Sequence, residues 1–224
     1  MAYDNSRDYI AFHKAGLASL YEEIGSYNLF MVCKKINEYA FRPLPDGYLF
    51  RLCRKDELEI WKRVVVLEQY VEYVSDYYNK VYAKNEDEFF RRVTFVCDEH
   101  NKPVASCFLW QSYGVINTLG WFRVLPEQEG KGLGRALLSK ILKTARYPVY
   151  LHTQPTSVCA LKLYSDFGFE LITNKIIGYR KNDLIKSLPY LQKTMAKADY
   201  KKLKFTTASD DLHNAALLSK NAEL

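Results

Sequence analysis

The sequence predicts one α/β domain with a mixed sheet flanked by helices, preceded by a helical extension and followed by a helical tail. Three observations predict this class. A chain of 224 residues that is 48% hydrophobic can bury one core and carry additions. Short apolar runs typical of strands alternate with segments of helical spacing, and no internal repeat is present. We expect an extension and linker at 1–46, the domain at 47–182 and the tail at 183–224.

The first forty residues have apolar side chains at helical spacing and end at the Pro-rich stretch "FRPLPDG". This pattern predicts a helical extension and then a linker. The apolar positions are Ile10, Leu17, Leu20, Tyr21 and Ile24, followed by Leu29, Val32, Cys33 and Ile36.

From Gly47 the pattern changes, and "YLFRLC" predicts a strand. Two helices follow, with apolar faces at Leu58, Trp61, Val64 and Val65 and then at Val74, Tyr77, Tyr78 and Val81. Asn85, with Glu88 three residues later, resembles the cap of a short helical turn. After it, "VTFVC" and "PVASCFLW" form a strand pair joined by the turn "DEHNK".

The next strand, "GVINTLGWFRV", leads into Pro126 and a glycine-rich segment that opens a helix with Leu133, Leu137, Ile141 and Leu142 on one side. That helix ends before Pro148, and "VYLHT" is the following strand. "TSVCALKLYSDF" is a helix closed by Gly168, and "FELIT" and "IIGYR" can pair as a final hairpin across "NK". From about Lys186 we expect one helical stretch and then frayed chain.

Composition excludes several classes of protein. The start of the chain lacks the pattern of a signal peptide and no apolar run approaches the ~20 residues that span a bilayer, so we expect a cytoplasmic protein without membrane contact. Five scattered cysteines form no CxxC or Cys/His cluster, so no metal site is indicated. The net charge of +6 favours anionic ligands, but the cations are spread out, so nucleic acid is not the expected partner.

The segment "EGKGLGRALL" has glycines at 130, 132 and 134 immediately before a helical pattern. Helix N-termini leave N–H groups unpaired and carry partial positive charge, so an anion can bind there if no side chain blocks it. The spacing fits neither a Walker loop nor the GxGxxG dinucleotide motif. The alternative is that the glycines only make a tight strand-to-helix connection.

The flanks of this segment resemble the acetyl-CoA loop of the GNAT-type N-acetyltransferases. In that family a strand ending in Val-x-Pro leads to Gln or Arg, two residues, Gly, one residue, and Gly or Ala at the start of a helix. Glu129 stands where the family has Gln or Arg, a departure that weakens contact from that side chain. The positions that match in register are Val124, Pro126, Gly132, Leu133, Gly134 and Leu137.

A second stretch, "SVCALKLYSDFGFEL", resembles the family's segment Asn-x-x-Ala-x-x-Leu-Tyr-x-x-x-Gly-Phe, with Ser157 in place of the Asn. The two motifs in this order cover about 47–182 and imply a mostly antiparallel central sheet in a single GNAT-like domain. The positions that fit are Ala160, Leu163, Tyr164, Gly168 and Phe169.

The resemblance implies acetyl-CoA as co-substrate and no metal. Backbone groups of the strand at Phe122 and Val124 would pair with the pantetheine arm, and the helix N-terminus would hold the pyrophosphate. The residues expected to bind the cofactor are Phe122, Val124, Glu129, Gly130, Lys131, Gly132, Leu133, Gly134, Arg135 and Ser157.

Tyr164 is the expected general acid, because a phenol of pKa ~10 can protonate the departing thiolate. The alternative is a core tyrosine on an amphipathic helix. The strand "GVINTLGWFRV" contains no carboxylate, so His152 is the candidate general base, although a lone His on a strand is more often structural. An acceptor that arrives deprotonated would need no base.

The implied reaction is direct attack of a primary amine, of a small molecule or a peptide, on acetyl-CoA in a ternary complex. The acceptor and the length of the donor's acyl chain stay open. In the family the acceptor pocket is bounded by the first two helices and the last hairpin, which points to aromatic residues that equally fit a core. Those residues are Tyr77, Tyr78, Tyr82, Trp110 and Trp121.

Dimers are common in the family, so a homodimer is a further expectation. Two rival functions remain. One is a non-catalytic acyl-CoA-binding module, motivated by the departures at Glu129 and Ser157 and by the missing strand carboxylate. The other is a basic nucleic-acid-binding protein, which would show steeply salt-dependent binding.

Overall fold

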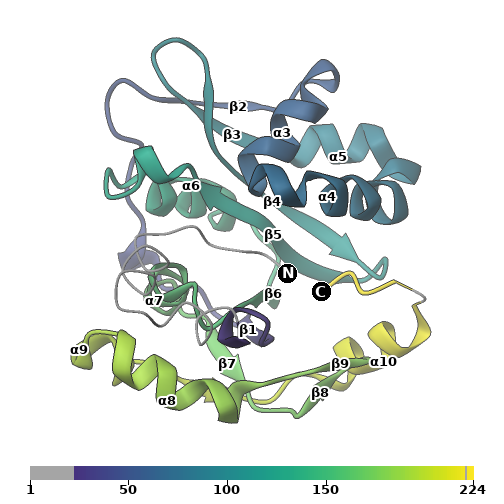
Figure 1. Ribbon diagram of the computed structural model, residues 1–224, viewed down its shortest axis with the longest axis vertical. Coiled ribbons are helices and arrows are strands. Elements are labelled where there is room, and N and C mark those ends of the chain that lie inside the picture. Colours follow the sequence, from purple (N-terminus) through teal and green to yellow (C-terminus); the bar gives the residue numbers. More distant parts are fainter. Residues whose placement is uncertain (1–22, 220) are drawn as a thin grey trace. The chain divides into compact units, whose positions relative to one another are not determined.

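The computed structural model describes residues 23–219 and 221–224, and these fall into two compact units (Figure 1). The unit that contains the glycine-rich segment, called here the loop unit, comprises Ala40–Gln111 and Asn117–Arg146. The other, called the β1 unit, comprises the described residues up to Tyr39, Ser112–Ile116, and the described residues from Tyr147 onward. The expected domain boundaries at 46/47 and 182/183 stay predictions.

In the loop unit the strands follow the order β5-β4-β3-β2. The pairs β2–β3 and β3–β4 are antiparallel. The strands are β2 (Leu49–Leu52), β3 (Thr94–Cys97), β4 (Pro103–Ser112) and β5 (Ile116–Val124), of which the end residues Ser112 and Ile116 are counted with the β1 unit. The helices are α3 (Leu58–Val65), α4 (Val71–Tyr77), α5 (Glu86–Arg92) and α6 (Leu133–Leu142), with a π-helical turn at Tyr78–Tyr82.

The helices α3, α4 and α5 lie against the strands β3 and β4 in Figure 1. An aromatic core joins these helices and strands. Trp61 is fully buried, and its indole meets Phe89 edge-on with ring centroids 4.9 Å apart. Each fully buried large apolar side chain contributes roughly 1.5–3 kcal/mol, and edge-to-face geometry adds to this. Tyr78, Tyr82 and Trp110 are also buried here. For these three the structure supports the core alternative and not a pocket wall.

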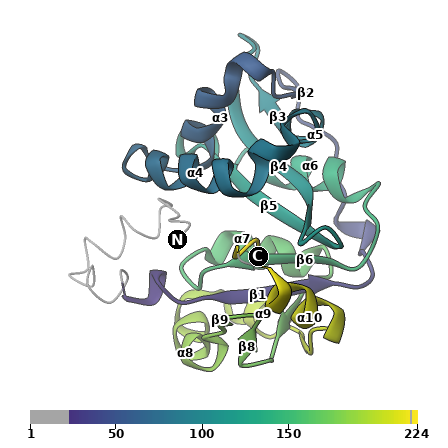
Figure 2. The ribbon, with the colours of Figure 1, turned by 90° about the vertical axis from the view of Figure 1, so that its right-hand side faces the viewer.

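In the β1 unit the strands follow the order β10-β7-β1-β6. β1 pairs antiparallel with both β6 and β7, and β10 is parallel to β7. Figure 2 shows α10 beside this sheet. Leu212 of α10 packs in one core cluster with Phe30, Val32 and Tyr150. The strands are β1 (Leu29–Cys33), β6 (Val149–Thr153), β7 (Glu170–Ile172) and β10 (Phe205–Thr206). The helices are α7 (Val158–Asp166), α8 (Leu184–Thr194), α9 (Lys197–Tyr200) and α10 (Asp210–Leu218).

The prediction of a helix across Leu29, Val32, Cys33 and Ile36 is wrong, because Leu29–Cys33 is the strand β1. All five of its residues are buried, as is usual for a strand covered on both faces. A short, continuous apolar run fits helix and strand spacing equally well. The rest of the expected N-terminal helix, residues 1–22, lies outside the described residues.

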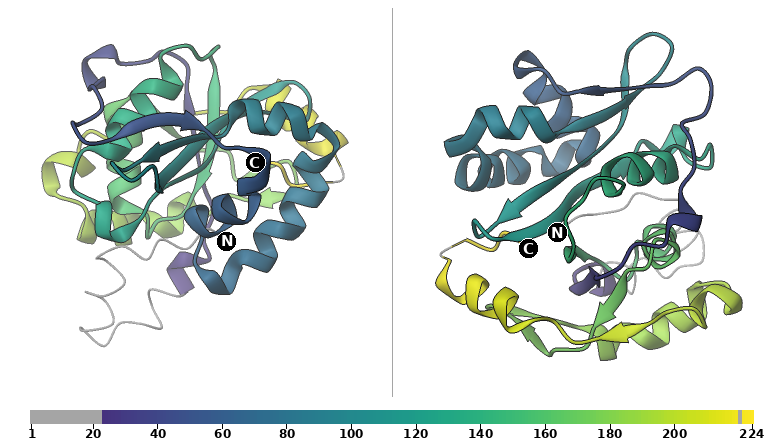
Figure 3. Two further views of the ribbon diagram at one scale, coloured as in Figure 1. Left: turned by 90° about the horizontal axis from the view of Figure 1, so that it is seen from above. Right: turned by 180° about the vertical axis from the view of Figure 1, so that it is seen from behind.

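The predicted pairing of "FELIT" with "IIGYR" is also wrong. β7 pairs with β1 and β10, whereas Ile176–Ile177 (β8) pairs with Arg180–Lys181 (β9). Nor does the tail fray after one helical stretch. It forms α8, α9, β10 and α10, seen from behind in Figure 3. Because β10 depends on pairing with β7, its two-residue strand leaves almost no local signal.

The predicted fold class is confirmed: the protein is a mixed α/β protein with mostly antiparallel strands flanked by helices. The predicted strands and helices between Gly47 and Gly168 are all present. One local detail differs, since α5 begins after Asn85 but the Asn85 side chain makes no cap hydrogen bond. Within the described part of the chain, no helix combines the length and apolar character needed to cross a bilayer.

Candidate functional site

The glycine-rich segment connects β5 to α6 in the loop unit. After a turn at Pro126–Gln128, Gly130 and Gly132 have φ angles of +77° and +83°, a region that non-glycine residues rarely adopt. The first backbone hydrogen bond inside α6 runs from Ala136 N–H to the Gly132 carbonyl at 3.0 Å. The N–H groups of Leu133 and Gly134 therefore belong to the helix N-terminus, where intrahelical partners are lacking.

The surface of this segment is open. Gly130, Lys131 and Gly132 are exposed, and a Cβ added to Gly130 would meet nothing within 4 Å. The Lys131 ammonium and the Tyr48 hydroxyl both donate to Gln128 Oε1, each at 2.8 Å. This side of the segment is thus held by side-chain contacts while the glycine backbone stays uncovered.

The other predicted residues of the segment differ in exposure. Glu129, Gly134 and Arg135 are half-buried, whereas Leu133 is buried in the core. Arg135 donates to the Ala40 carbonyl at 3.4 Å. Leu133 therefore contributes a backbone N–H and an anchoring side chain. Lys131 and Arg135 are cations within the segment.

Strand β5 carries the other predicted contacts of the loop unit. Phe122 and Val124 are half-buried, and Arg123 between them donates to the carbonyls of Val64 and Val66 at 3.0 and 2.7 Å. Those carbonyls lie at the C-terminus of α3, where a cation is favourable. Arg123 therefore ties this part of β5 to α3.

Tyr164 and Ser157 lie in the β1 unit, on and before α7. Tyr164 is 6% exposed, and its ring is 5.7 Å from that of Phe169. Ser157 is buried. Its N–H donates to the Gln154 carbonyl at 3.1 Å, but its side chain makes no cap hydrogen bond to α7. The burial of Tyr164 fits the alternative of a core tyrosine. Since the ring is buried, a role in proton transfer would require the hydroxyl group to reach the reacting atoms.

His152 lies on β6 in a polar cluster of the β1 unit. Its Nε2 is 2.9 Å from both the Asn28 side-chain oxygen and the Arg180 guanidinium. Burial, together with the positive charge of Arg180, lowers the pKa of His152 well below its usual value. Because a guanidinium only donates, the contact with Arg180 is a hydrogen bond when Nε2 carries its lone pair. When Nε2 carries the proton instead, it donates to the Asn28 oxygen, which also accepts from Arg180 at 2.7 Å. His152 is therefore neutral, and its Nε2 is engaged in either tautomer.

The structure thus divides the predicted residues between the two units. The loop unit brings together Phe122, Val124 and residues 129–135, while His152, Ser157 and Tyr164 belong to the β1 unit. Sequence reasoning missed Asn28 and Arg180 as neighbours of His152. Nothing in the local pattern signals them, because both partners come from distant parts of the chain.

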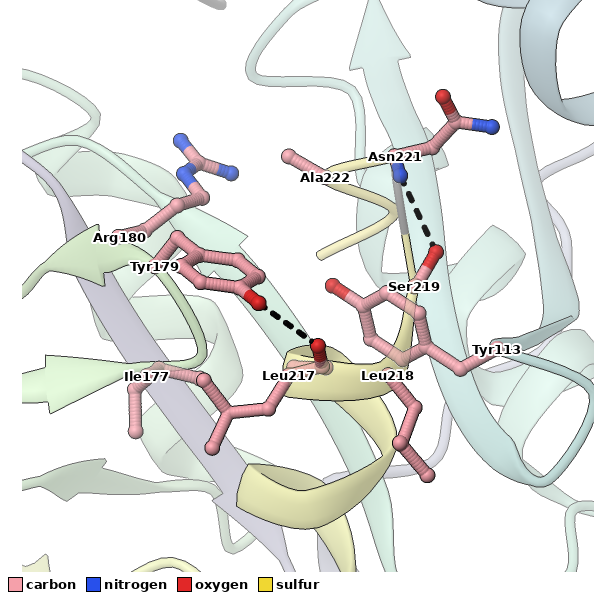
Figure 4. Close-up of a pocket in the computed structure, with 10 residues that line it drawn as sticks. Tyr113, Ile177, Tyr179, Arg180, Leu217, Leu218, Ser219, Asn221 and Ala222 are labelled. Atoms are coloured by element: carbon pink, nitrogen blue, oxygen red, sulfur yellow. Dashed lines mark hydrogen bonds between the residues drawn. The ribbon is translucent and has the colours of Figure 1, made fainter.

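A pocket of about 470 Å³ lies in the β1 unit between the β8–β9 hairpin and the end of α10 (Figure 4). Tyr179 stands at its wall and donates to the Leu217 carbonyl at 2.8 Å. Tyr113 and Arg180 also line it. None of the residues predicted to bind cofactor or to move protons does. Among the described residues, no group of three or more His, Cys, Asp or Glu side chains is arranged to hold a metal ion.

The sequence model of the acetyltransferase (GNAT) family matches residues 59–169. Residues 59–169 belong to the GNAT family. The match includes β5, the glycine-rich segment, α6, β6 and α7, and so contains every position of the two stretches that fits the family pattern. The expectation of a GNAT-type acyltransferase agrees with this family.

Solved structures similar to this chain include two GCN5-related N-acetyltransferases. The one from Sphaerobacter thermophilus is 17% identical with a TM-score of 0.47, over 70% of this chain and 53% of its own. The one from Kribbella flavida is 15% identical with a TM-score of 0.43, over 69% and 60%. A GCN5-related N-acetyltransferase-like protein from Streptococcus suis is 15% identical with a TM-score of 0.42, over 69% and 64%.

In each of these cases the match spans less than two thirds of the solved chain. No curated protein matches this chain significantly.

Proposed function

We propose that the protein is an N-acetyltransferase that transfers the acetyl group of acetyl-CoA to a primary amine within a ternary complex. The observation that supports it best is the exposed glycine backbone at the N-terminus of α6, inside the region that matches the GNAT family. Backbone N–H groups and the helix dipole favour an anion at this point. The pyrophosphate of CoA supplies that anion.

In this proposal the segment from Glu129 to Arg135 holds the pyrophosphate. The contacts are the N–H groups of the segment, with Lys131 and Arg135 as nearby cations. The departure at Glu129 from the family's Gln or Arg leaves most of the contact to the backbone. Phe122 and Val124 contribute backbone groups to the pantetheine arm, and Ser157 is the remaining proposed contact.

The reaction balances with one proton lost and one gained. The acceptor nitrogen attacks the thioester carbon, the carbon–sulfur bond breaks, and the amine proton leaves as the amide forms. Tyr164 is the proposed donor of the proton that the CoA sulfur takes up, and binding both substrates together supplies much of the acceleration. Backbone N–H groups polarise the thioester carbonyl.

His152 is the proposed base, and its surroundings set a condition for that role. While Arg180 donates to Nε2, the lone pair needed for proton abstraction is occupied. Base catalysis through Nε2 therefore requires Arg180 to release it. An acceptor that reaches the site deprotonated needs no base, and this alternative stays part of the proposal.

The first test is a calorimetric titration of the protein with acetyl-CoA, with NADH and ATP as anionic controls. Selective binding of acetyl-CoA supports the donor assignment. A thiol-release screen over polyamines, amino acids, aminoglycosides and peptides then identifies the acceptor. If folded protein binds acetyl-CoA no better than ATP, the proposed function fails.

A second candidate function is a non-catalytic acyl-CoA-binding module. It is favoured by the occupied Nε2 of His152 and the burial of Tyr164. This module would bind acetyl-CoA but release no thiol with any amine in the panel. The homodimer and the cytoplasmic location stay predictions, to be tested by light scattering of the purified protein and by imaging of a tagged chain.

A further inference from the structure

Strand β5 contains a residue in an unusual backbone conformation directly before the proposed cofactor contacts. Trp121 has a φ angle of +53°, in the left-handed region. For a bulky residue within a strand this conformation is strained and persists only where the surroundings hold it. The next residue is Phe122, whose backbone is proposed to pair with the pantetheine arm.

The Trp121 side chain is held on several sides within the loop unit. Its Nε1–H donates to the Tyr82 hydroxyl at 2.8 Å. Its ring also meets Tyr77 and Trp61 edge-on, with centroids 5.3 and 5.8 Å apart. The indole orientation is therefore fixed by one directional contact and two packing contacts.

The acceptor of that hydrogen bond, Tyr82, is itself buried and closely packed. Tyr82 is 3% exposed, and its ring packs against Trp110 with centroids 4.9 Å apart and against Phe89 at 5.0 Å. It is the last residue of the π-helical turn Tyr78–Tyr82. A π-turn inserts one extra residue into a helix and so redirects the side chains that follow it, and such turns are frequent at functional sites. Here the turn ends on the side chain that receives the Trp121 N–H.

We propose that Tyr82 is a positioning residue for β5, the strand whose backbone is proposed to pair with the pantetheine arm. By accepting the indole N–H, it holds Trp121 in the left-handed conformation and thereby sets the direction of the backbone groups at Phe122 and Val124. This inference rests on the proposed function, since those groups matter only if a thioester arm binds there. It predicts that Tyr82 affects binding of the pantetheine end of acetyl-CoA, whereas binding of the nucleotide end depends on the glycine-rich segment.

The chain offers a matched control. Tyr78 belongs to the same π-helical turn, is 5% exposed, and packs against the same ring of Phe89. Its hydroxyl, however, donates to Glu86 at 3.2 Å. Tyr78→Phe therefore removes an equivalent buried hydroxyl without removing the acceptor of the Trp121 N–H.

The experiment measures dissociation constants for acetyl-CoA and for adenosine 3′,5′-bisphosphate, which carries only the nucleotide end, in wild type, Tyr82→Phe and Tyr78→Phe. For Tyr82→Phe we expect acetyl-CoA to bind roughly three- to tenfold more weakly, the usual effect of losing one hydrogen bond. Binding of the bisphosphate should not change, and Tyr78→Phe should resemble wild type for both ligands. Equal effects of the two variants, or equal weakening of both ligands, would overturn the positioning role.

The hydrogen bond itself is followed without ligand through the Trp121 indole N–H resonance, assigned by its loss in Trp121→Phe. We expect Tyr82→Phe to shift this resonance and speed its exchange with solvent, and Tyr78→Phe to leave it in place. If wild type binds no acetyl-CoA, the proposed function falls and the positioning role with it. If wild type binds acetyl-CoA and Tyr82→Phe binds it equally well, only the positioning role falls.

Discussion

Glycines with positive φ occur in both units but in opposite settings. In the loop unit, Gly130 has a φ of +77° and open space where a Cβ would be. In the β1 unit, Gly168 has a φ of +95°, and a Cβ would stand 2.8 Å from the Lys35 carbonyl oxygen. The first glycine leaves backbone uncovered at the surface, and the second lets two backbone segments approach closely.

This difference teaches that one local conformation serves two purposes. An uncovered glycine at a helix N-terminus is suited to a ligand, because no side chain blocks the approach. A glycine pressed against a carbonyl oxygen closes a helix and contributes to stability. The two cases are separated by neighbours that are distant in sequence, and substitutions at each glycine test the distinction.

The largest expected effect is on stability. Gly168→Ala should lower the free energy of unfolding by about 3 kcal/mol, from the left-handed conformation and the contact with the Lys35 oxygen together. Gly130→Ala, which meets no neighbour, should cost only about 1 kcal/mol. Urea unfolding of both variants measures the difference. Equal losses would mean that the close approach at Gly168 does not contribute to the free energy of unfolding.

The next effect concerns the ligand. Gly130→Asp places a negative charge beside the proposed pyrophosphate site, and we expect acetyl-CoA to bind about thirtyfold more weakly. Gly130→Asn has the same shape and tolerates positive φ equally well, so its affinity should stay within about threefold of wild type. Calorimetric titration of the pair compares them. If the two variants bind alike, charge at this position does not matter and the anion site is elsewhere.

A smaller effect is expected at Tyr164. Tyr164→Phe should keep the affinity for acetyl-CoA but lower kcat more than roughly tenfold, within the range for loss of a general acid. Tyr190→Phe is the control, because Tyr190 is also 6% exposed and belongs to the β1 unit. Steady-state rates with the acceptor found in the amine screen decide the matter. An unchanged kcat in Tyr164→Phe would assign Tyr164 to the core.

The smallest effect is the pH dependence due to His152. Because the folded protein lowers the pKa of His152, the unfolded chain takes up a proton that the folded chain resists. Stability should therefore decrease as the pH falls below ~6.5, by about 1 kcal/mol for each pH unit until the folded pKa is reached. His152→Gln should show a shallower decrease between pH 7 and 5 in urea unfolding. Parallel curves for variant and wild type would contradict the lowered pKa.

The fold was predictable where the chain carries a local signal. The helix at Leu58–Val65 has a clear apolar face, and the segment before Leu133 combines glycines with a helix start, so both could be read from spacing. Leu29–Cys33 could not, because an unbroken apolar run has no period that separates helix from strand. Its pairing with β6 and β7 determined the outcome.

The candidate site divides in the same way. The sequence by itself determined the family resemblance and the place of the proposed backbone anion site, because glycine spacing and a helix N-terminus are local properties of the chain. Only the tertiary structure decided that Arg180 contacts Nε2 of His152, that Tyr164 is buried, and that Tyr82 accepts the indole N–H of Trp121. Protonation, burial and side-chain orientation depend on neighbours brought together by folding, and no local pattern encodes those neighbours.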